Sequence, residues 1–160
     1  MVQNIIKIDE SKLWFVIRYN VYSAGYSRYS SPVTFSQIEN EYIELTEFIL
    51  NICLIGDFNA RTAEEDEFIA LDENILFETF DDFIENASNV LQQLNSPLTR
   101  SNVDKGKKPY GNILLNLCRG NDLFIVNGRI GDNKESNLTC RNASVVDHTI
   151  LNSEFKKNPL

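Results

Sequence analysis

A short apolar stretch that ends at a glycine and is followed by two polar side chains constrains this chain more than any other feature. Residues 52–56 read Ile-Cys-Leu-Ile-Gly, and Asp57 and Asn59 follow at alternate positions. Because the side-chain period of an extended chain is two, both polar groups point one way while Phe58 points into the core. The pattern predicts a buried strand that delivers a carboxylate and an amide to one pocket. An ordinary Asp/Asn turn after a strand is the alternative interpretation.

The rest of the chain alternates between strand and helix patterns. Aromatic and β-branched residues over 13–22 predict a strand, and apolar positions between 35 and 49 recur near the helical period, with Thr34 or Ser36 as the cap. The later segments predict a helix at 110–119, a strand at 123–127 and a strand pair at 136–140 and 144–151. This alternation favours an α/β layered fold, and 160 residues is a single-domain length.

Charge is distributed unevenly along the chain. The formal net charge of −8 counts against a protein that binds nucleic acid through a general basic surface. Residues 64–85 hold ten of the 23 acids and no lysine or arginine, so 13 acids face 15 bases elsewhere. We interpret residues 62–106 as an acidic surface insertion, because no single apolar period is sustained there. The bases available either for phosphate contacts or for an ordinary solvated face are Arg100, Lys105, Lys107, Lys108, Arg119, Arg129 and Arg141.

Several classes of protein are disfavoured by the sequence. No apolar run approaches the roughly 18 residues of a membrane span, so no membrane partner is expected. The first residues lack the basic flank and apolar stretch of a secretory signal, which predicts an intracellular protein that is not secreted. Cys53, Cys118 and Cys140 are an odd number at wide spacing, so we expect buried thiols rather than disulfides or a zinc site.

Residues 56–61, Gly-Asp-Phe-Asn-Ala-Arg, resemble the GDFNAR signature of the endonuclease/exonuclease/phosphatase superfamily, which includes deoxyribonuclease I and the apurinic/apyrimidinic endonucleases. The likeness continues in order through residues 111–118, 122–129, 139–140 and 144–147, and it is most similar to the endonuclease domains of non-LTR retrotransposons. The resemblance implies a layered α/β sandwich of the deoxyribonuclease I-like type. Residues 1–160 would be a partial domain of this kind, with N-terminal strands and the last strand missing.

The resemblance also implies a chemistry, the hydrolysis of a DNA phosphodiester by water with Mg²⁺. Asp57 would be a metal ligand or water-orienting base, and Asn59 would donate a hydrogen bond to a phosphate oxygen. Asp147 would orient a catalytic histidine, and Tyr22, at the end of the first predicted strand, would contact the phosphate. A nuclear location and a reverse transcriptase domain in the full-length protein are implied in the same way.

Two parts of the family's site have no counterpart in these 160 residues: the main metal-binding glutamate and the Ser-Asp-His segment that supplies the histidine. The only histidine, His148, follows Asp147 on a predicted strand, so the two side chains point to opposite faces and His148 is expected to be packed. We therefore expect an isolated chain that is nearly silent in catalysis and, with a sheet edge exposed, poorly stable. A non-catalytic interaction module and an enzyme for another phosphoester remain as alternatives.

Overall fold

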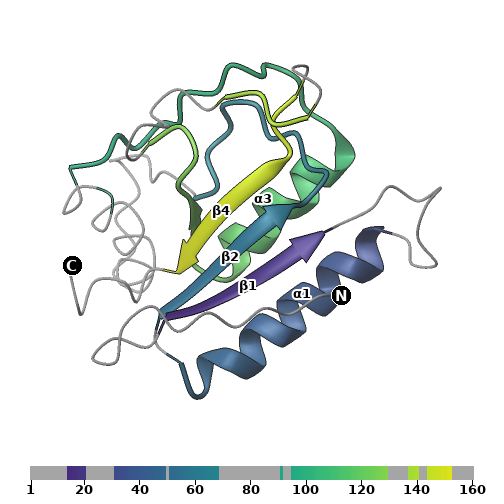
Figure 1. The fold of residues 1–160 in the computed structure, drawn as a ribbon, viewed down its shortest axis with the longest axis vertical. Coiled ribbons are helices and arrows are strands. Elements are labelled where there is room, and N and C mark those ends of the chain that lie inside the picture. The colour runs from purple at the N-terminus through teal and green to yellow at the C-terminus, as the bar shows by residue number, and fades with distance from the viewer. Residues whose placement is uncertain are drawn as a thin grey trace, which may run out of the picture.

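The chain folds into strands and helices that alternate along the sequence, as Figure 1 shows. The computed structural model describes residues 14–20, 31–49, 51–68, 91, 95–129, 137–140 and 144–152, and over 14–20 and at residue 31 the description is of the backbone. In chain order the elements are β1 (Trp14–Asn20), α1 (Ser31–Thr46), β2 (Asn51–Asp57), α3 (Pro109–Gly120), β3 (Leu123–Ile125) and β4 (Asp147–Asn152). This composition is the mixed α/β class that the sequence predicts.

The four strands form one mixed sheet in the order β1-β2-β4-β3. β1 is parallel to β2, whereas β4 is antiparallel to both of its neighbours, β2 and β3. The arrowheads of β1 and β2 in Figure 1 therefore lie at the end of the sheet where β4 begins. Asp57 ends β2 there and Asp147 begins β4, and we call this edge of the sheet the carboxylate end.

Both helices pack against one face of the sheet. α1 contributes Phe35, Ile38 and Tyr42 to the core, which follows the period that the sequence indicates, and α3 contributes Leu114 and Leu117. The strand residues in the same cluster are Ile52, Leu54, Leu123, Ile125 and Ile150. Because fully burying one such side chain is worth about 1.5–3 kcal/mol, this cluster holds the helices and the sheet together.

The opposite face of the sheet is covered only in part within the described residues. Phe124 of β3 is buried there with Leu91, and Leu151 packs against them. Ile55 of β2, by contrast, keeps 39% of its surface exposed. The carboxylate end shares this second face, because Asp57 and Ile55 alternate with the helix-facing residues of β2.

Several element boundaries differ from the sequence predictions, including that of β4, which was predicted from residue 144 and begins at Asp147. α1 begins at Ser31, ahead of the predicted cap, because Pro32 is tolerated in a first helical turn. The strand predicted at 136–140 is wrong over 137–140, where a single bridge joins Cys140 to Ser144. β3 stops at Ile125. Residues 21–22 of the first predicted strand lie outside the described residues, as does residue 136.

The interpretation of residues 62–106 as a surface insertion is wrong at both of its ends. Glu67 and Arg100 are buried, and the Glu67 carboxylate accepts hydrogen bonds from Arg100 Nε (3.1 Å), from Arg129 Nη1 and from the Ile125 N–H of β3 (3.0 Å). Arg129 is 2% exposed. These two arginines neutralise an internal acid and are therefore unavailable to a phosphate. Residues 69–90 lie outside the described residues.

Two further sequence predictions can be compared with the fold. Cys53 and Cys118 are buried free thiols as predicted, and Cys140 is free and half-buried. Across the part of the chain that the structure describes, no helix has both the length and the apolar character needed to cross a membrane.

Candidate functional site

The carboxylate end brings two predicted site residues together in register. Asp57 and Asp147 are directly opposed partners in the antiparallel pairing of β2 with β4. On the other side of β2, Asn20 of β1 is the parallel partner of Asp57. Side chains of directly opposed residues lie on the same face of a sheet. β2 and β4 therefore place the Asp57 and Asp147 side chains side by side on one face.

Asp57 is held in an environment that disfavours its charge. Burial raises the pKa of its carboxyl above the ordinary value, and the charge of Asp147 acts in the same direction. The Asn59 backbone N–H opposes this by donating to Asp57 Oδ1 at 2.8 Å. A cation beside the two carboxylates would remove the repulsion between them. Adjacent carboxylates that a cation would stabilise in this way are typical of metal and phosphoryl-transfer sites.

The extended conformation of β2 does not continue to Asn59. β2 ends at Asp57, and Asn59 has a φ of 50°, in the left-handed region that Asn tolerates better than most residues. Its N–H bond to Asp57 Oδ1 forms an Asx turn. The extended conformation assumed for Asn59 is thus wrong, and the turn interpretation is confirmed. Phe58 is fully buried as predicted.

Hydrogen bonds attach the loop after β2 to β4 and to the residue that precedes it. The Phe58 N–H donates to Val146 O at 2.9 Å, and His148 Nε2 lies 2.7 Å from Ala60 O. Because a carbonyl oxygen only accepts, Nε2 carries the proton of the neutral imidazole. These contacts hold the segment that carries Asn59 against the strand that carries Asp147.

His148 is a packed residue, as the sequence predicts. It is 1% exposed, its ring centroid lies 6.2 Å from that of Phe58, and its Nδ1 has no hydrogen-bond partner among the described residues. Burial lowers the pKa of His148 to about 4. The burial pattern of β4 puts it on the face opposite to Asp147. A neutral imidazole enclosed in this way cannot serve as the general base of the site.

Two further residues support Asp147, and sequence reasoning gave them no role. Asn127 donates to Asp147 O at 3.3 Å and accepts the Thr149 N–H at 2.7 Å. The Thr139 hydroxyl oxygen accepts the N–H groups of Val146 at 3.1 Å and Asp147 at 3.2 Å. Both residues belong to segments that carry the sequence resemblance, which was the available signal. Tyr22, the fourth predicted site residue, lies outside the described residues.

Several of the bases considered for phosphate contacts pair with other groups of the chain. Besides Arg100 and Arg129, Lys105 is paired with Glu64 and Lys107 with Glu65. The Arg119 guanidinium donates to Asp66 O at 2.6 Å. Glu64, Glu65 and Glu67 belong to the acidic block, so bases that the sequence left open as phosphate contacts or a solvated face partly neutralise it.

A divalent cation would find two carboxylates at the carboxylate end. Within the described ranges, no three His, Cys, Asp or Glu side chains gather into a metal-binding group. Mg²⁺, however, commonly takes only one or two carboxylates and completes its coordination with water and substrate phosphate. Asp57 and Asp147 fit that donor set, whereas the buried imidazole of His148 does not.

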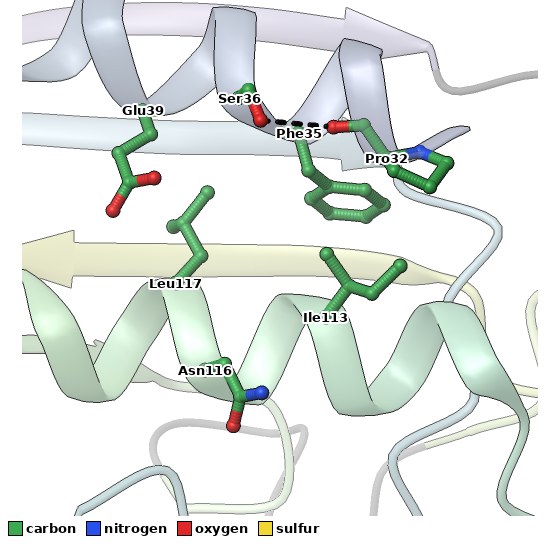
Figure 2. Close-up of a pocket in the computed structure, with 7 residues that line it drawn as sticks. All are labelled: Pro32, Phe35, Ser36, Glu39, Ile113, Asn116 and Leu117. Atoms are coloured by element: carbon green, nitrogen blue, oxygen red, sulfur yellow. Dashed lines mark hydrogen bonds between the residues drawn. The ribbon is translucent and has the colours of Figure 1, made fainter. Parts of the chain in front are cut away.

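A separate hollow of about 250 Å³ lies between the two helices. Figure 2 shows it between α1 and α3, with Phe35, Ile113 and Leu117 directed into it. Its only acid is Glu39, whose Oε1 accepts a hydrogen bond from Asn121 at 2.7 Å. The hollow belongs to the helical layer, while Asp57 and Asp147 belong to the other face of the sheet. It is therefore not part of the carboxylate end.

Comparison with known proteins assigns no family to the chain: no family model, curated protein or solved structure matches it. The carboxylate end and the sequence resemblance are therefore the two features of the chain that bear on its function.

Proposed function

We propose that this chain is part of a Mg²⁺-dependent phosphodiesterase of the endonuclease/exonuclease/phosphatase superfamily, with a deoxyribonuclease I-like layered fold, and that it nicks DNA. The observation that carries the proposal is the register of β2 and β4, which sets Asp57 opposite Asp147. These acids come from two separate segments of the resemblance, 56–61 and 144–147. Their pairing is what a shared catalytic site requires.

Each residue has a role that follows from its position. Asp57 and Asp147 would hold Mg²⁺, which when bound supplies Lewis-acid stabilisation to a phosphoryl oxygen. The Asn59 carboxamide, next to this pair in the chain, would donate to a phosphate oxygen. Asp147 would also orient a histidine, as the resemblance implies. His148 is excluded from that role because it is buried and bonded to Ala60 O.

The first test is metal binding at the carboxylate end. Titration of the chain with Mn²⁺, followed by the relaxation of water protons, should show a site that Asp57→Asn abolishes. Glu64→Gln is the control, since Glu64 is an exposed acid paired with Lys105. Equal Mn²⁺ binding by Asp57→Asn and the unmodified chain would contradict the proposal.

Cleavage of supercoiled plasmid with Mg²⁺ is the second test. Lack of an available general base typically costs about 10² to 10⁴ in rate, so we expect very slow nicking by the 160-residue chain. Whatever nicking occurs should vanish in Asp57→Ala. Persistence of the full rate in that variant would show that the activity comes from elsewhere.

A second candidate function is hydrolysis of a small phosphoester in place of DNA. The observation that favours it is that Arg100 and Arg129 are buried against Glu67, while Lys105 and Lys107 pair with Glu64 and Glu65 at the surface. Binding to duplex DNA depends on neutralised phosphates and weakens steeply with salt. Hydrolysis of bis(p-nitrophenyl) phosphate that is insensitive to salt, without plasmid nicking, would favour the small substrate.

A further inference from the structure

Asp104 joins the two segments that carry the paired acids. It is 5% exposed, and its two carboxylate oxygens accept four hydrogen bonds. Oδ2 accepts Arg61 Nε at 2.8 Å and the Val145 N–H at 3.0 Å, while Oδ1 accepts Arg61 Nη2 at 2.5 Å and the Gly106 N–H at 2.9 Å. One buried side chain thus contacts the loop that follows β2 and the segment that precedes β4.

We propose that Asp104 is a positioning residue that sets the separation of the Asp57 and Asp147 carboxylates, and thereby the affinity of the carboxylate end for a divalent cation. Arg61 follows Asn59 by two residues, and Val145 precedes Asp147 by two residues. The inference rests on the proposed function, because it concerns the same metal site. Asp104 itself does not touch the reacting groups.

The surroundings of Arg61 leave this contact little freedom. The Lys108 N–H donates to Arg61 O at 3.2 Å. A Cβ added at Gly106 would lie 2.0 Å from Arg61 Nη2, and one added at Gly111 would lie 1.9 Å from Arg61 O. At Gly111 the clash is with backbone, so only glycine fits there, whereas a side chain at Gly106 would require the Arg61 guanidinium to move. The backbone and guanidinium of Arg61 are therefore enclosed from two sides while Asp104 holds the guanidinium.

The chemistry of the contact requires a carboxylate. All four partners of Asp104 are N–H donors, and an ionised Asp is an acceptor at both oxygens. Asparagine would place an NH₂ group against two of those donors, which leaves buried N–H groups unsatisfied. The Arg61 hydrogen bonds are the main reason that the pKa of Asp104 is lowered to about 2. Charge and geometry thus act together in this contact.

The test compares three variants of the full chain by Mn²⁺ titration and amide hydrogen exchange. Asp104→Asn removes the charge, and Arg61→Lys keeps the positive charge but loses the paired geometry. Glu67→Gln is the matched control, because Glu67 is also a buried acid bonded to arginine, but its backbone partner is Ile125 of β3. If Asp104→Asn fails to fold, Arg61→Lys decides the question.

We expect Mn²⁺ affinity to fall about 10- to 100-fold in Asp104→Asn, the usual effect of losing a residue that orients metal ligands, and less in Arg61→Lys. Glu67→Gln should lower the melting temperature and leave the affinity unchanged. Exchange at the Phe58 and Asp147 amides should accelerate in Asp104→Asn but not in the control.

Two results would overturn the inference. One is unchanged Mn²⁺ affinity in Asp104→Asn, even with faster exchange, since Asp104 would then act only in stability. The other is unchanged exchange at Phe58 and Asp147. If the unmodified chain binds no Mn²⁺, the proposed function fails, and the exchange comparison alone decides whether Asp104 positions the two segments.

Discussion

Asp57 carries a charge that the folded chain disfavours. Its pKa is raised by burial and by Asp147, so the folded state takes up a proton more readily than the unfolded state. The contribution of Asp57 to stability is therefore greatest at acid pH and is lost as the pH rises through the raised pKa. An ionised residue that lowers the stability of the folded chain at neutral pH is typical of a functional site.

Replacing Asp57 with Asn should therefore stabilise the protein at neutral pH while removing metal binding. The gain is expected to be at most about 1 kcal/mol, because solvent screens a half-exposed group. Urea unfolding of both proteins at pH 7 and at pH 3 measures it, and the difference should shrink at pH 3. A variant that is less stable than the unmodified chain at pH 7 would contradict this account.

His148 makes stability depend on pH in the opposite direction. Its pKa is lowered from 6.5 to about 4 in the folded chain, so the unfolded state binds the extra proton between these values. Stability should fall as the pH drops from 6.5 to 4, by up to about 3 kcal/mol for a fully buried imidazole. His148→Gln retains a donor for Ala60 O and should remove most of this slope, as measured by urea unfolding at several pH values. An unchanged slope would assign the pH dependence to other groups.

At the scale of elements, the fit of α3 against the Arg61 backbone can be tested by two glycine substitutions in the same helix. Gly111→Ala should destabilise the chain by roughly 1–3 kcal/mol, because the new Cβ would lie 1.9 Å from Arg61 O. Gly120→Ala is the control, since the nearest atom to its Cβ is Glu39 Oε1 at 3.9 Å. Thermal melting of both variants measures the effect, and equal stability would show that α3 can shift without cost.

The buried face of a helix or strand could be predicted where the apolar residues follow a single helical or strand period. The apolar period of α1 indicated Phe35, Ile38 and Tyr42, and strand alternation separated Asp147 from His148, because each pattern depends on local geometry. Register was not predictable, since the partner of Asp57 depends on a strand about 90 residues later in the chain. The sequence could not decide between a turn and an extended chain at Asn59, because both use the same residue types.

At the scale of the whole molecule, the buried cluster of Glu67, Arg100 and Arg129 fixes residues 62–68 and 95–101 against β3. No sequence pattern indicated this cluster. Acids and arginines far apart in the chain are expected to lie at the surface unless the structure shows that they are buried. The composition therefore suggested an insertion where the fold places a buried contact. Of the candidate site, the acids were found by their resemblance, while Asp104, Asn127 and Thr139 required the structure.

Glu67→Gln should cost about 3–5 kcal/mol, because it leaves two buried arginines without a compensating charge. Glu64→Gln, which breaks an exposed pair with Lys105, should cost far less than Glu67→Gln, because solvent screens the pair. Urea unfolding of the two variants compares the losses directly. Similar losses would mean that the cluster is hydrated and contributes little.

The mixed direction of the sheet has a consequence for how such a protein can diversify. The chain leaves β2 and enters β4 at the carboxylate end, so two described segments that are remote in sequence, 58–68 and 144–146, both adjoin the Asp57–Asp147 pair. Each connection can change in length or composition while the strands that anchor it keep their pairing. Ligand selectivity can thus evolve through changes in one connecting segment at a time, while the paired strands and their carboxylates stay the same.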